Sequence, residues 1–404
     1  MNKKLFILLP SFYGGGTEKK VSYLIPFLKK HFQIKIITFE KDRDYAIDED
    51  IISLTPLSGE SNRFIKFLFF PIALFRFIRI IRNNPKNVVL SFLFRADIVN
   101  AISNLFYPHK MIMSIETNII LDFSMDDNPI KRYIFPLIAR IIYRKANLIL
   151  VVSKGVGKSI IEKFGISPKK VVTIYNGFDI DKISKMAKES LGDKYSAIFE
   201  NPTIINIGRL GKQKGQEYLI RIFAKVVEQV PDVYLFIIGK GELLGKLKKI
   251  SRDSGVANKV IFPGFVDNPY KYLSKGRLYV STSLWEGFGN TLVEALSCGI
   301  NIISSDCQFG PREIISPGTD PGLQIEKPEF SDYGILMPAL NGGEFDSEEK
   351  VFQKERLWAE VIIEQLSKKS SIGVRMKLVK RAQDFSIEKI ADRYVQVINS
   401  IFSF

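Results

Sequence analysis

The feature that most constrains the fold is a repeated local order of apolar strand, glycine-containing loop and helix. Near the N-terminus, residues 3–9 are mainly apolar, residues 10–18 contain three consecutive glycines, and a helical pattern runs over residues 19–30. The same order recurs from residue 203 to about residue 229. Units of this kind build parallel α/β sheets, and glycine lets their backbone approach a phosphate group closely. We therefore expect two nucleotide-binding α/β domains.

Length and composition agree with two ordinary domains. The chain has 404 residues, of which 46% are hydrophobic and 25% are charged, as in globular proteins with sizeable cores. Its two cysteines, Cys298 and Cys307, cannot form a disulfide framework, so a reducing cytoplasm is expected. The two histidines are far apart in the sequence and have no cysteine near them, which argues against a zinc site.

The N-terminal apolar run is interpreted as the first buried strand. The run from Leu5 to Leu9 is too short for the apolar part of a signal peptide and leads directly into the glycine loop. Elsewhere, no window of about 20 residues is free of charge, so a transmembrane helix is not expected.

Positive charge is concentrated in the first half of the chain. The net charge is +15, and residues 1–178 carry 27 Lys and Arg against 14 Asp and Glu. Such asymmetry indicates a polyanionic partner, either nucleic acid or anionic lipid.

Two segments of the first half combine basic with aromatic and aliphatic residues. The segment from Phe64 to Arg82 suits a helix lying in a membrane interface, with Pro71 kinking it or starting its longer part. A buried helix of the first domain is the alternative. The segment from Ile130 to Lys145 repeats the pattern and favours an anionic membrane surface as partner.

The most informative stretch of the second half runs over residues 281–313. A strand at residues 278–281 precedes the loop Glu286-Gly-Phe-Gly289, and a helix is expected from Asn290 to Ser297. Glu286 then lies just before the helix and Glu294 lies within it. Because helix N-termini attract anions, this arrangement can hold a phosphate beside a carboxylate that binds sugar hydroxyls.

The sequence from Glu286 to Glu294 resembles the Glu-x7-Glu motif of retaining glycosyltransferases of family 4. The following segment, residues 306–313, is similar to a variant found in bacterial surface-polysaccharide assembly. The resemblance implies the GT-B fold, an α/β architecture of two Rossmann-like, doubly wound domains facing a central cleft. It also implies that Glu286 contacts the donor sugar and that Glu294 holds the ribose.

The same resemblance assigns roles to other loops. Arg209 and Lys214, in a glycine-containing loop after a strand, match the cations that hold the donor diphosphate. With Glu286 they are the expected catalytic residues. The remaining donor-binding candidates, by resemblance, are Gly15 and Gly16 for the diphosphate side, Gly289, Asn290 and Thr291 at the helix end, and Val266 beside the nucleobase.

One departure from the family concerns the acceptor side. Family members often have a histidine in the loop after the strand at residues 110–115, where this chain has Glu116-Thr117-Asn118. Glu116 and Asn118 are therefore weak acceptor-side candidates.

Matches to three short motifs are set aside. Asp42-Arg-Asp44 and Asp48-Glu-Asp50 match a metal-binding Asp-x-Asp pattern, but three-residue matches are frequent in acidic loops, and no metal is expected. The loop at residues 153–160 lacks a Walker glycine at position 152, and the loop at residues 239–244 lacks the third glycine of a dinucleotide fingerprint.

The expected organisation is a basic acceptor-binding domain at residues 1–178, a nucleotide-sugar domain at residues 179–384 and a C-terminal helix, residues 385–404, that crosses back to the first domain. The expected activity is metal-independent, retaining transfer of a hexose or N-acetylhexosamine from a nucleotide diphosphate sugar, such as a UDP-sugar. The expected acceptor is a polyprenyl-linked glycan at the inner face of the cytoplasmic membrane.

Two alternatives stay open: a nucleotide-sugar epimerase of the same architecture, and a non-enzymatic basic protein that binds membrane or nucleic acid. Nucleic-acid binding is not favoured, because the aromatic residues lie in apolar runs.

Overall fold

The structure is a computed structural model that describes residues 3–12, 15–42, 50–82, 87–126, 128–340, 348–368 and 371–402. Within this part of the chain, residues cluster into two compact units. The first consists of Met1–Phe178 with Ser386–Phe404, and the second of Asp179–Phe385.

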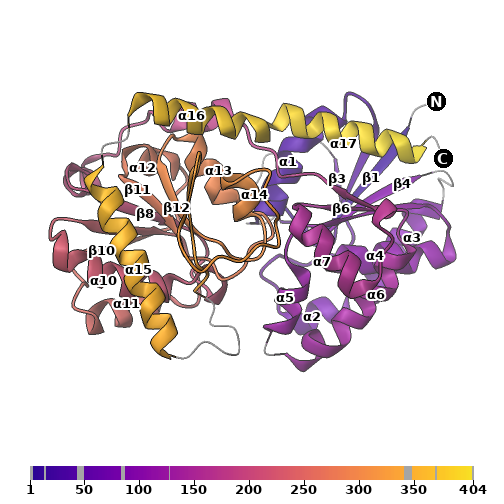
Figure 1. Cartoon of the computed structure of the whole chain (residues 1–404). Coiled ribbons are helices and arrows are strands. Elements are labelled where there is room, and N and C mark those ends of the chain that lie inside the picture. Colours follow the sequence, from indigo (N-terminus) through magenta and orange to yellow (C-terminus); the bar gives the residue numbers. More distant parts are fainter. Residues whose placement is uncertain are drawn as a thin grey trace. The chain divides into compact units, whose positions relative to one another are not determined.

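The described residues of the first unit form a seven-stranded parallel sheet (Figure 1). The strand order is β3-β2-β1-β4-β5-β6-β7, so the order reverses between β1 and β4, where doubly wound sheets bind ligands. The strands are β1 (Lys4–Leu9), β2 (Gln33–Thr38), β3 (Ile51–Ser53), β4 (Val88–Phe92), β5 (Lys110–Ile115), β6 (Leu148–Val151) and β7 (Val171–Thr173).

Both faces of this sheet are covered by helices, because consecutive residues of its central strands are apolar and point to opposite faces. Leu5 and Ile7 of β1 pack with one cluster, formed largely by α1 and α17, whereas Phe6 and Leu8 pack with α3 and α4 on the other face. The helices are α1 (Gly16–Leu28), α2 (Arg63–Leu68), α3 (Phe70–Arg82), α4 (Phe94–Phe106), α5 (Ile119–Ser124), α6 (Phe135–Lys145), α7 (Lys154–Phe164) and α17 (Ile387–Phe402), with a π-helical turn, η1 (Ile130–Ile134), before α6.

The C-terminal helix α17 belongs to the first unit. Its apolar residues, including Ile390 and Ile398, are buried against the same core as those of α1, and the two helices lie side by side (Figure 1). A backbone hydrogen bond from Ile387 N–H to the Phe178 carbonyl, at 2.8 Å, fixes the start of α17. The sequence therefore returns to the first unit after completing the second.

The described residues of the second unit also form a seven-stranded sheet, of order β10-β9-β8-β11-β12-β14-β13. All neighbouring strands are parallel except β13 and β14. The strands are β8 (Thr203–Ile207), β9 (Tyr234–Ile238), β10 (Val260–Gly264), β11 (Leu278–Ser281), β12 (Asn301–Ser305), β13 (Glu329–Ser331) and β14 (Gly334–Met337). Its order reverses between β8 and β11.

The helices of the second unit are α8 (Ile180–Met186), α9 (Asp193–Ser196), α10 (Gln216–Gln229), α11 (Leu244–Asp253), α12 (Tyr270–Lys275), α13 (Asn290–Ser297), α14 (Pro311–Ile315), α15 (Glu348–Ser367) and α16 (Ile372–Ala382). Short 3-10 turns of this unit lie at Ala197–Glu200, Lys212–Lys214 and Gln383–Phe385, and one of the first unit lies at Pro168–Lys170. The prediction of two Rossmann-like α/β domains is thus confirmed.

The segment from Phe64 to Arg82 combines features of both sequence interpretations. It forms two helices with a break at Phe69, and Pro71 lies in the first turn of α3, where a missing N–H is tolerated. One face of α3, with Ala73, Phe77 and Ile81, is buried in the first unit, and the remaining face is exposed.

Two further sequence expectations can be compared with the described residues. Among them, no helix has the length and apolar character needed to cross a bilayer, and no group of His, Cys, Asp or Glu is arranged to hold a metal. Of the two Asp-x-Asp matches, Asp44 and Asp48 lie outside the described residues, and Asp42 accepts hydrogen bonds from Ser58 and Gly59.

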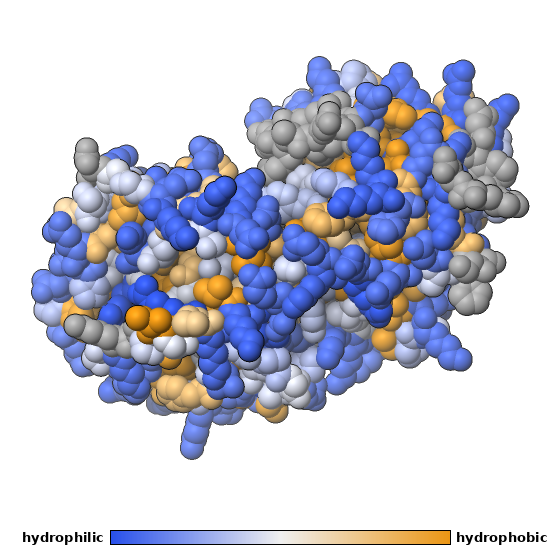
Figure 2. Space-filling model, turned by 90° about the horizontal axis from the view of Figure 1, so that it is seen from above, coloured by the Kyte–Doolittle hydropathy of each residue, from blue (hydrophilic) through white to orange (hydrophobic). Residues whose placement is uncertain are grey.

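On the face seen in Figure 2, hydrophobic residues lie among hydrophilic ones.

Candidate functional site

A lysine–glutamate pair lies at the carboxyl ends of β8 and β11, the neighbouring central strands of the second unit. Lys214 Nζ donates to Glu286 Oε1 at 2.5 Å, and Ser283 Oγ donates to the same oxygen at 2.7 Å. The side chain of Lys214 is 19% exposed and that of Glu286 is 9% exposed. The pair is therefore largely buried, and part of the lysine side chain remains exposed.

The local backbone explains why two residues so far apart in sequence meet. Gly215 has φ +60°, and a Cβ there would lie 2.2 Å from the Thr282 carbonyl oxygen. Only glycine tolerates both the left-handed conformation and this close approach. Gly215 thus holds the loop after β8 against the loop after β11, and Thr282 Oγ1 donates back to the Lys214 carbonyl at 3.2 Å.

The N-terminus of α13 lies at the same edge of the sheet. Gly289 precedes the helix with φ +99°, and Asn290 and Thr291 form its first turn. Thr291 Oγ1 accepts a hydrogen bond from Tyr279 Oη at 2.6 Å, which fixes its rotamer. The free N–H groups of this turn and the helix dipole favour an anion here.

Glu294 lies in the second turn of α13 and is 8% exposed. Its Oε1 accepts a hydrogen bond from Tyr270 Oη at 3.0 Å. The tyrosine is part of α12, which follows the loop containing Val266, a half-buried residue. The two glutamates of the Glu-x7-Glu motif are thus both buried and hydrogen-bonded, unlike ordinary surface glutamates.

Arg209 differs from Lys214 in its surroundings. Its side chain is 77% exposed, and one guanidinium nitrogen donates to Glu242 Oε2 at 3.1 Å. An exposed pair of this kind contributes little to stability, so the guanidinium can exchange its partner for a phosphate at small cost.

The loop that positions Glu286 has a support that sequence reasoning missed. Glu286 N–H donates to the Gln308 carbonyl at 2.8 Å, and Phe309 N–H donates to the Glu286 carbonyl at 3.0 Å. Arg312, 2% exposed, follows in α14 and forms a buried ion pair with Asp306. Burial raises the pKa of Asp306, although the arginine lowers it in part. The similarity of residues 306–313 to a family variant was the sequence signal for this element.

The glycine loop of the first unit follows β1 at the point where the strand order reverses. Gly15 precedes α1 and Gly16 begins it. The Glu18 carboxylate folds back over this loop, so that a Cβ on Gly15 would lie 1.8 Å from Glu18 Oε2. Burial raises the pKa of Glu18 to about 7, partly offset by a backbone hydrogen bond. Glu18 was not among the sequence candidates.

The acceptor-side candidate Glu116 is sealed within the first unit. Lys20 Nζ donates to its two carboxylate oxygens at 2.8 and 2.7 Å, and both side chains are 3% exposed. The ammonium group also lies 5.6 Å from the ring centroids of Phe92 and Tyr394. Burial lowers the pKa of Lys20, but Glu116 outweighs this effect and the net shift is upward.

Asn118, the second acceptor-side candidate, begins α5. Its Oδ1 accepts from Leu121 N–H at 3.3 Å, whereas its buried Nδ2 has no hydrogen-bond partner among the described residues. An orphaned buried amide is rare in folded proteins and indicates a place for a ligand or water.

These observations divide the candidate residues into two groups. Lys214, Glu286, Glu294, Arg209 and the start of α13 surround the carboxyl ends of β8 and β11 in the second unit. Gly15, Gly16, Glu116 and Asn118 lie at the carboxyl edge of the first sheet. The second-unit group provides cations, helix N–H groups and carboxylates, which are the groups required to bind a diphosphate and polyhydroxylated rings.

Comparison with known families agrees with this division. A model described as glycosyl transferases group 1 matches residues 191–333 of the second unit. A model described as Glycosyltransferase Family 4 matches residues 14–182 of the first unit.

Curated relatives extend the match over most of the chain. An uncharacterized glycosyltransferase of Methanocaldococcus jannaschii is 36% identical over 304 residues, which cover 71% of this chain and 73% of the relative. An N-acetylgalactosamine-N,N'-diacetylbacillosaminyl-diphospho-undecaprenol 4-alpha-N-acetylgalactosaminyltransferase of Campylobacter jejuni subsp. jejuni is 30% identical over 354 residues, which cover 87% of this chain and 88% of the relative.

Solved structures give the fold. HepE of Anabaena, in complex with UDP and glucose, has a TM-score of 0.74 at 18% identity and covers 99% of this chain and 100% of its own. Sucrose-phosphate synthase of Thermosynechococcus elongatus has a TM-score of 0.76 at 17% identity and covers 100% of both chains. The protein therefore belongs to glycosyltransferase family 4 and has the GT-B fold.

Proposed function

We propose that the protein transfers a hexose or N-acetylhexosamine, with retention of anomeric configuration, from a UDP-sugar to a saccharide acceptor in the assembly of a surface glycan such as O-antigen or capsule. The observation that carries this proposal is the Lys214–Glu286 pair beside the N-terminus of α13. The family membership supports a transferase, and the UDP and glucose bound by HepE support the donor class.

The donor would exchange the partners of two cations. A diphosphate placed at Gly289, Asn290 and Thr291 attracts Lys214 from Glu286 and Arg209 from Glu242, because the diphosphate carries two negative charges and each carboxylate carries one. Glu286 is then left to accept hydrogen bonds from sugar hydroxyls. Val266 would border the nucleobase, and Glu294 would accept from the ribose.

The same groups would lower the barrier to transfer. As the bond between the anomeric carbon and the diphosphate breaks, negative charge grows on the leaving oxygen, and Lys214, Arg209 and the helix N–H groups are placed to stabilise it. In our proposal these cations replace a metal ion. The acceptor hydroxyl attacks the anomeric carbon from the side of the leaving group and passes its proton to an oxygen of the departing diphosphate, which gives retention without an enzymatic nucleophile.

The acceptor would bind in the first unit, at the carboxyl edge of its sheet. Because Glu116 is held by the buried Lys20, we assign it the role of positioning its loop. We assign Asn118 the contact with the acceptor, through its orphaned Nδ2. The diphospho-undecaprenol in the name of the Campylobacter relative supports a polyprenyl-linked acceptor.

A lipid-linked acceptor requires contact with a membrane, and we place the protein at the inner face of the cytoplasmic membrane. Both basic and aromatic segments of the first unit support this placement. The segment from Phe64 to Arg82 exposes Phe67 and Phe75, and the segment from Ile130 to Lys145 exposes Tyr133 and Leu137. Amphipathic basic helices with exposed aromatic residues lie in membrane interfaces.

Transfer assays test the proposal. The purified chain is incubated with labelled UDP-, GDP- and ADP-sugars and a polyprenyl diphosphate saccharide, with EDTA present, and the product linkage is determined by NMR. We expect an α-linked product from an α-linked UDP-sugar, and no product from Glu286→Gln. Release of free or epimerised sugar without an acceptor would contradict the proposal and favour an epimerase.

A further inference from the structure

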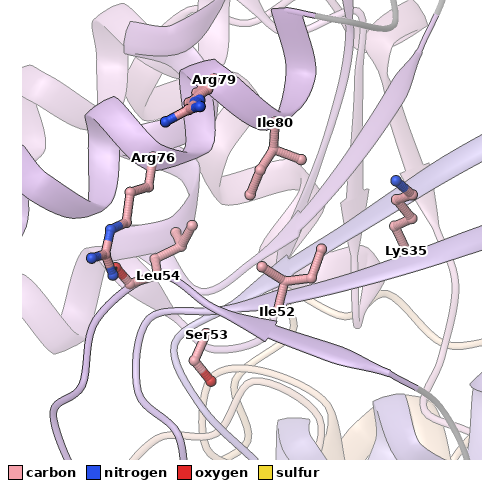
Figure 3. A pocket seen from close by; sticks show the side chains of 7 residues that line it. All are labelled: Lys35, Ile52, Ser53, Leu54, Arg76, Arg79 and Ile80. Atoms are coloured by element: carbon pink, nitrogen blue, oxygen red, sulfur yellow. The ribbon is translucent and has the colours of Figure 1, made fainter.

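A hollow of about 560 Å³ lies beside α3, on the side of the first unit where β3 forms the edge of the sheet (Figure 3). The arginines Arg76 and Arg79 lie on one side of it and Lys35 on the other. Three apolar side chains, Ile52, Leu54 and Ile80, lie between them. The residues described as lining the hollow thus combine three cations with an apolar floor and include no carboxylate.

The two arginines are set for an anion by different means. Arg76 Nη1 donates to the Leu54 carbonyl at 2.9 Å, which holds the guanidinium at the rim while leaving its other N–H groups for a further acceptor. Arg79 is one turn further along α3, and residues three apart on a helix lie on the same side. A planar guanidinium with several N–H groups suits the oxygens of a phosphate.

The exposed face of α3 changes character along its length. Ile72 and Phe75 near its start are 43% and 67% exposed, and the exposed residues that follow are Arg76, Arg79 and Arg82. The preceding helix α2 adds more exposed apolar side chains, namely Phe64, Ile65, Phe67 and Leu68. We call these six side chains of α2 and α3 the apolar tip.

The apolar tip and the arginines adjoin on the exposed face of α3, as they do in a helix that lies in a membrane interface. Phe75 and Arg79 are four residues apart, and residues at this spacing are neighbours on a helix surface. Amphipathic elements bury their apolar side about 5–10 Å into the boundary between headgroups and acyl chains. When the apolar tip is buried to this depth, Arg79 and Arg76 lie among the headgroups.

Among the described residues, no carboxylate forms an ion pair with these arginines. Glu40, a buried carboxylate on this side of the unit, is paired with Arg95 at 2.6 Å and lies 3.6 Å from Lys66. Lys66 Nζ also donates to the Gly59 carbonyl. Lys66 and Arg95 therefore serve the protein itself, and the cations of the hollow are the ones that complement an external anion.

We propose that the hollow binds the phosphate of an anionic phospholipid while the apolar tip enters the membrane. The apolar floor of Ile52, Leu54 and Ile80 would contact the glycerol backbone and the first acyl carbons. This proposal rests on the membrane contact of the proposed function and names the lipid group that is bound. The residues of the hollow belong to the first unit, whereas the donor-binding residues belong to the second. Phosphate binding in the hollow would fix the orientation of the first unit on the bilayer, in addition to attracting this unit electrostatically.

Vesicle co-sedimentation of the full chain tests the site. The vesicles contain phosphatidylcholine with about one-third phosphatidylglycerol, and the double variant Arg76→Gln/Arg79→Gln is compared with Lys163→Gln/Lys169→Gln, which removes two exposed cations elsewhere in the same unit. Removing the two arginines is expected to weaken partitioning about 30-fold, the effect of two basic residues at an anionic surface. The lysine control should change it less than about threefold.

Two further variants separate phosphate recognition and insertion from charge alone. Arg76→Lys/Arg79→Lys keeps the charge but loses the planar guanidinium groups. The binding free energy that it loses should be more than half of that lost by Arg76→Gln/Arg79→Gln. Phe75→Ser should weaken binding about tenfold, whereas Met376→Ser, equally exposed on α16, should have no effect.

Several results would overturn the proposal. If Arg76→Gln/Arg79→Gln and Lys163→Gln/Lys169→Gln bound the vesicles equally, only the net charge of the protein would matter. Competition by millimolar inorganic phosphate, with the apolar tip variant unaffected, would show a free-anion site instead of a lipid site. UDP binding measured on the same variants distinguishes a failure of the lipid site from a failure of the transferase proposal. If the transferase proposal is wrong, the unmodified chain will not bind UDP, and the vesicle result will be unchanged.

Discussion

The two units each hold a lysine–glutamate pair at the carboxyl edge of a parallel sheet, and the surroundings of the pairs differ. Lys214 and Glu286 of the second unit are 19% and 9% exposed, and they adjoin a helix N-terminus. Lys20 and Glu116 of the first unit are both 3% exposed and are covered by Phe92 and Tyr394.

In our proposal the same two functional groups serve ligand binding in the second unit and structure in the first. An ion pair that can reach a ligand can exchange partners, because the new partner replaces the old one. A sealed pair cannot do so, since separation would leave two uncompensated charges in a medium of low dielectric constant. The following predictions test this contrast, from the largest expected effect to the smallest.

Replacing Lys214 should have the largest effect on activity. Lys214→Ala removes a cation from the position where leaving-group charge develops, so we expect transfer to fall at least about 1000-fold. The free energy of unfolding should fall by less than for Lys20→Ala, by about 1–2 kcal/mol, because the Lys214–Glu286 pair is more exposed than the Lys20–Glu116 pair. Transfer kinetics and urea unfolding measure the two effects, with Lys248→Ala on exposed α11 as control. A large loss of stability would contradict the contrast.

Replacing Lys20 should act on stability instead. Lys20→Ala leaves the buried Glu116 carboxylate without a cation, although Ser114 Oγ still donates to it at 2.6 Å. Breaking a buried ion pair in this way costs about 3–5 kcal/mol of unfolding free energy. The matched double variant Lys20→Met/Glu116→Leu removes both charges and should recover most of this loss. If the double variant were as unstable as the single variant, the loss would come from packing and not from an unpaired charge.

Replacing Arg209 should give a moderate loss of nucleotide affinity. Among the described residues, its exposed guanidinium pairs with Glu242 alone, and such an exposed pair contributes little to stability, so Arg209→Ala should leave the unfolding midpoint unchanged. The loss of one charged contact to the diphosphate should weaken UDP binding about tenfold. An unchanged UDP affinity in calorimetry would remove Arg209 from the donor site.

The low dielectric constant of the first unit should also be visible in its pH dependence. Burial raises the pKa of Asp97 to about 8, with Ser91 and Tyr143 as hydrogen-bond donors that lower it and Glu116 as a charge that raises it. Between pH 4 and pH 8 the folded protein keeps a proton that the unfolded chain releases. Stability from this group therefore falls as pH rises, by on the order of 1 kcal/mol per pH unit.

Asp97→Asn should remove this contribution. Urea unfolding at pH 5.5 and pH 7.5 is expected to show a fall in stability that is about 2 kcal/mol larger for the unmodified protein than for the variant. Parallel pH dependence of the two proteins would mean that Asp97 is ionised in the folded state.

Neutralising Glu286 should have the smallest effect on nucleotide binding. Glu286→Gln releases Lys214 from its ion pair, so we expect UDP to bind as tightly as before or up to about threefold more tightly, although transfer is lost. Calorimetry of this variant sharpens the partner exchange described above. A large loss of UDP affinity would contradict it.

The sequence supported the fold and the second-unit residues better than it supported the first unit. Strand and helix patterns predicted the two α/β domains, and the resemblance brought together Glu286 and Lys214, which lie 72 positions apart. The Lys20–Glu116 pair was missed because it depends on the adjacency of β1, β4 and β5 and on α17 arriving from the end of the chain. The orphaned Nδ2 of Asn118 and the hollow beside α3 likewise depend on side-chain placement, which no local pattern encodes.

Calorimetric titration with UDP, GDP and ADP, in the presence of EDTA, tests the central claim most directly. The account predicts micromolar binding of UDP to the unmodified protein and loss of that binding in Lys214→Ala. Absence of binding for every nucleotide, or UDP binding that survives the loss of Lys214, would contradict a donor site built on the Lys214–Glu286 pair.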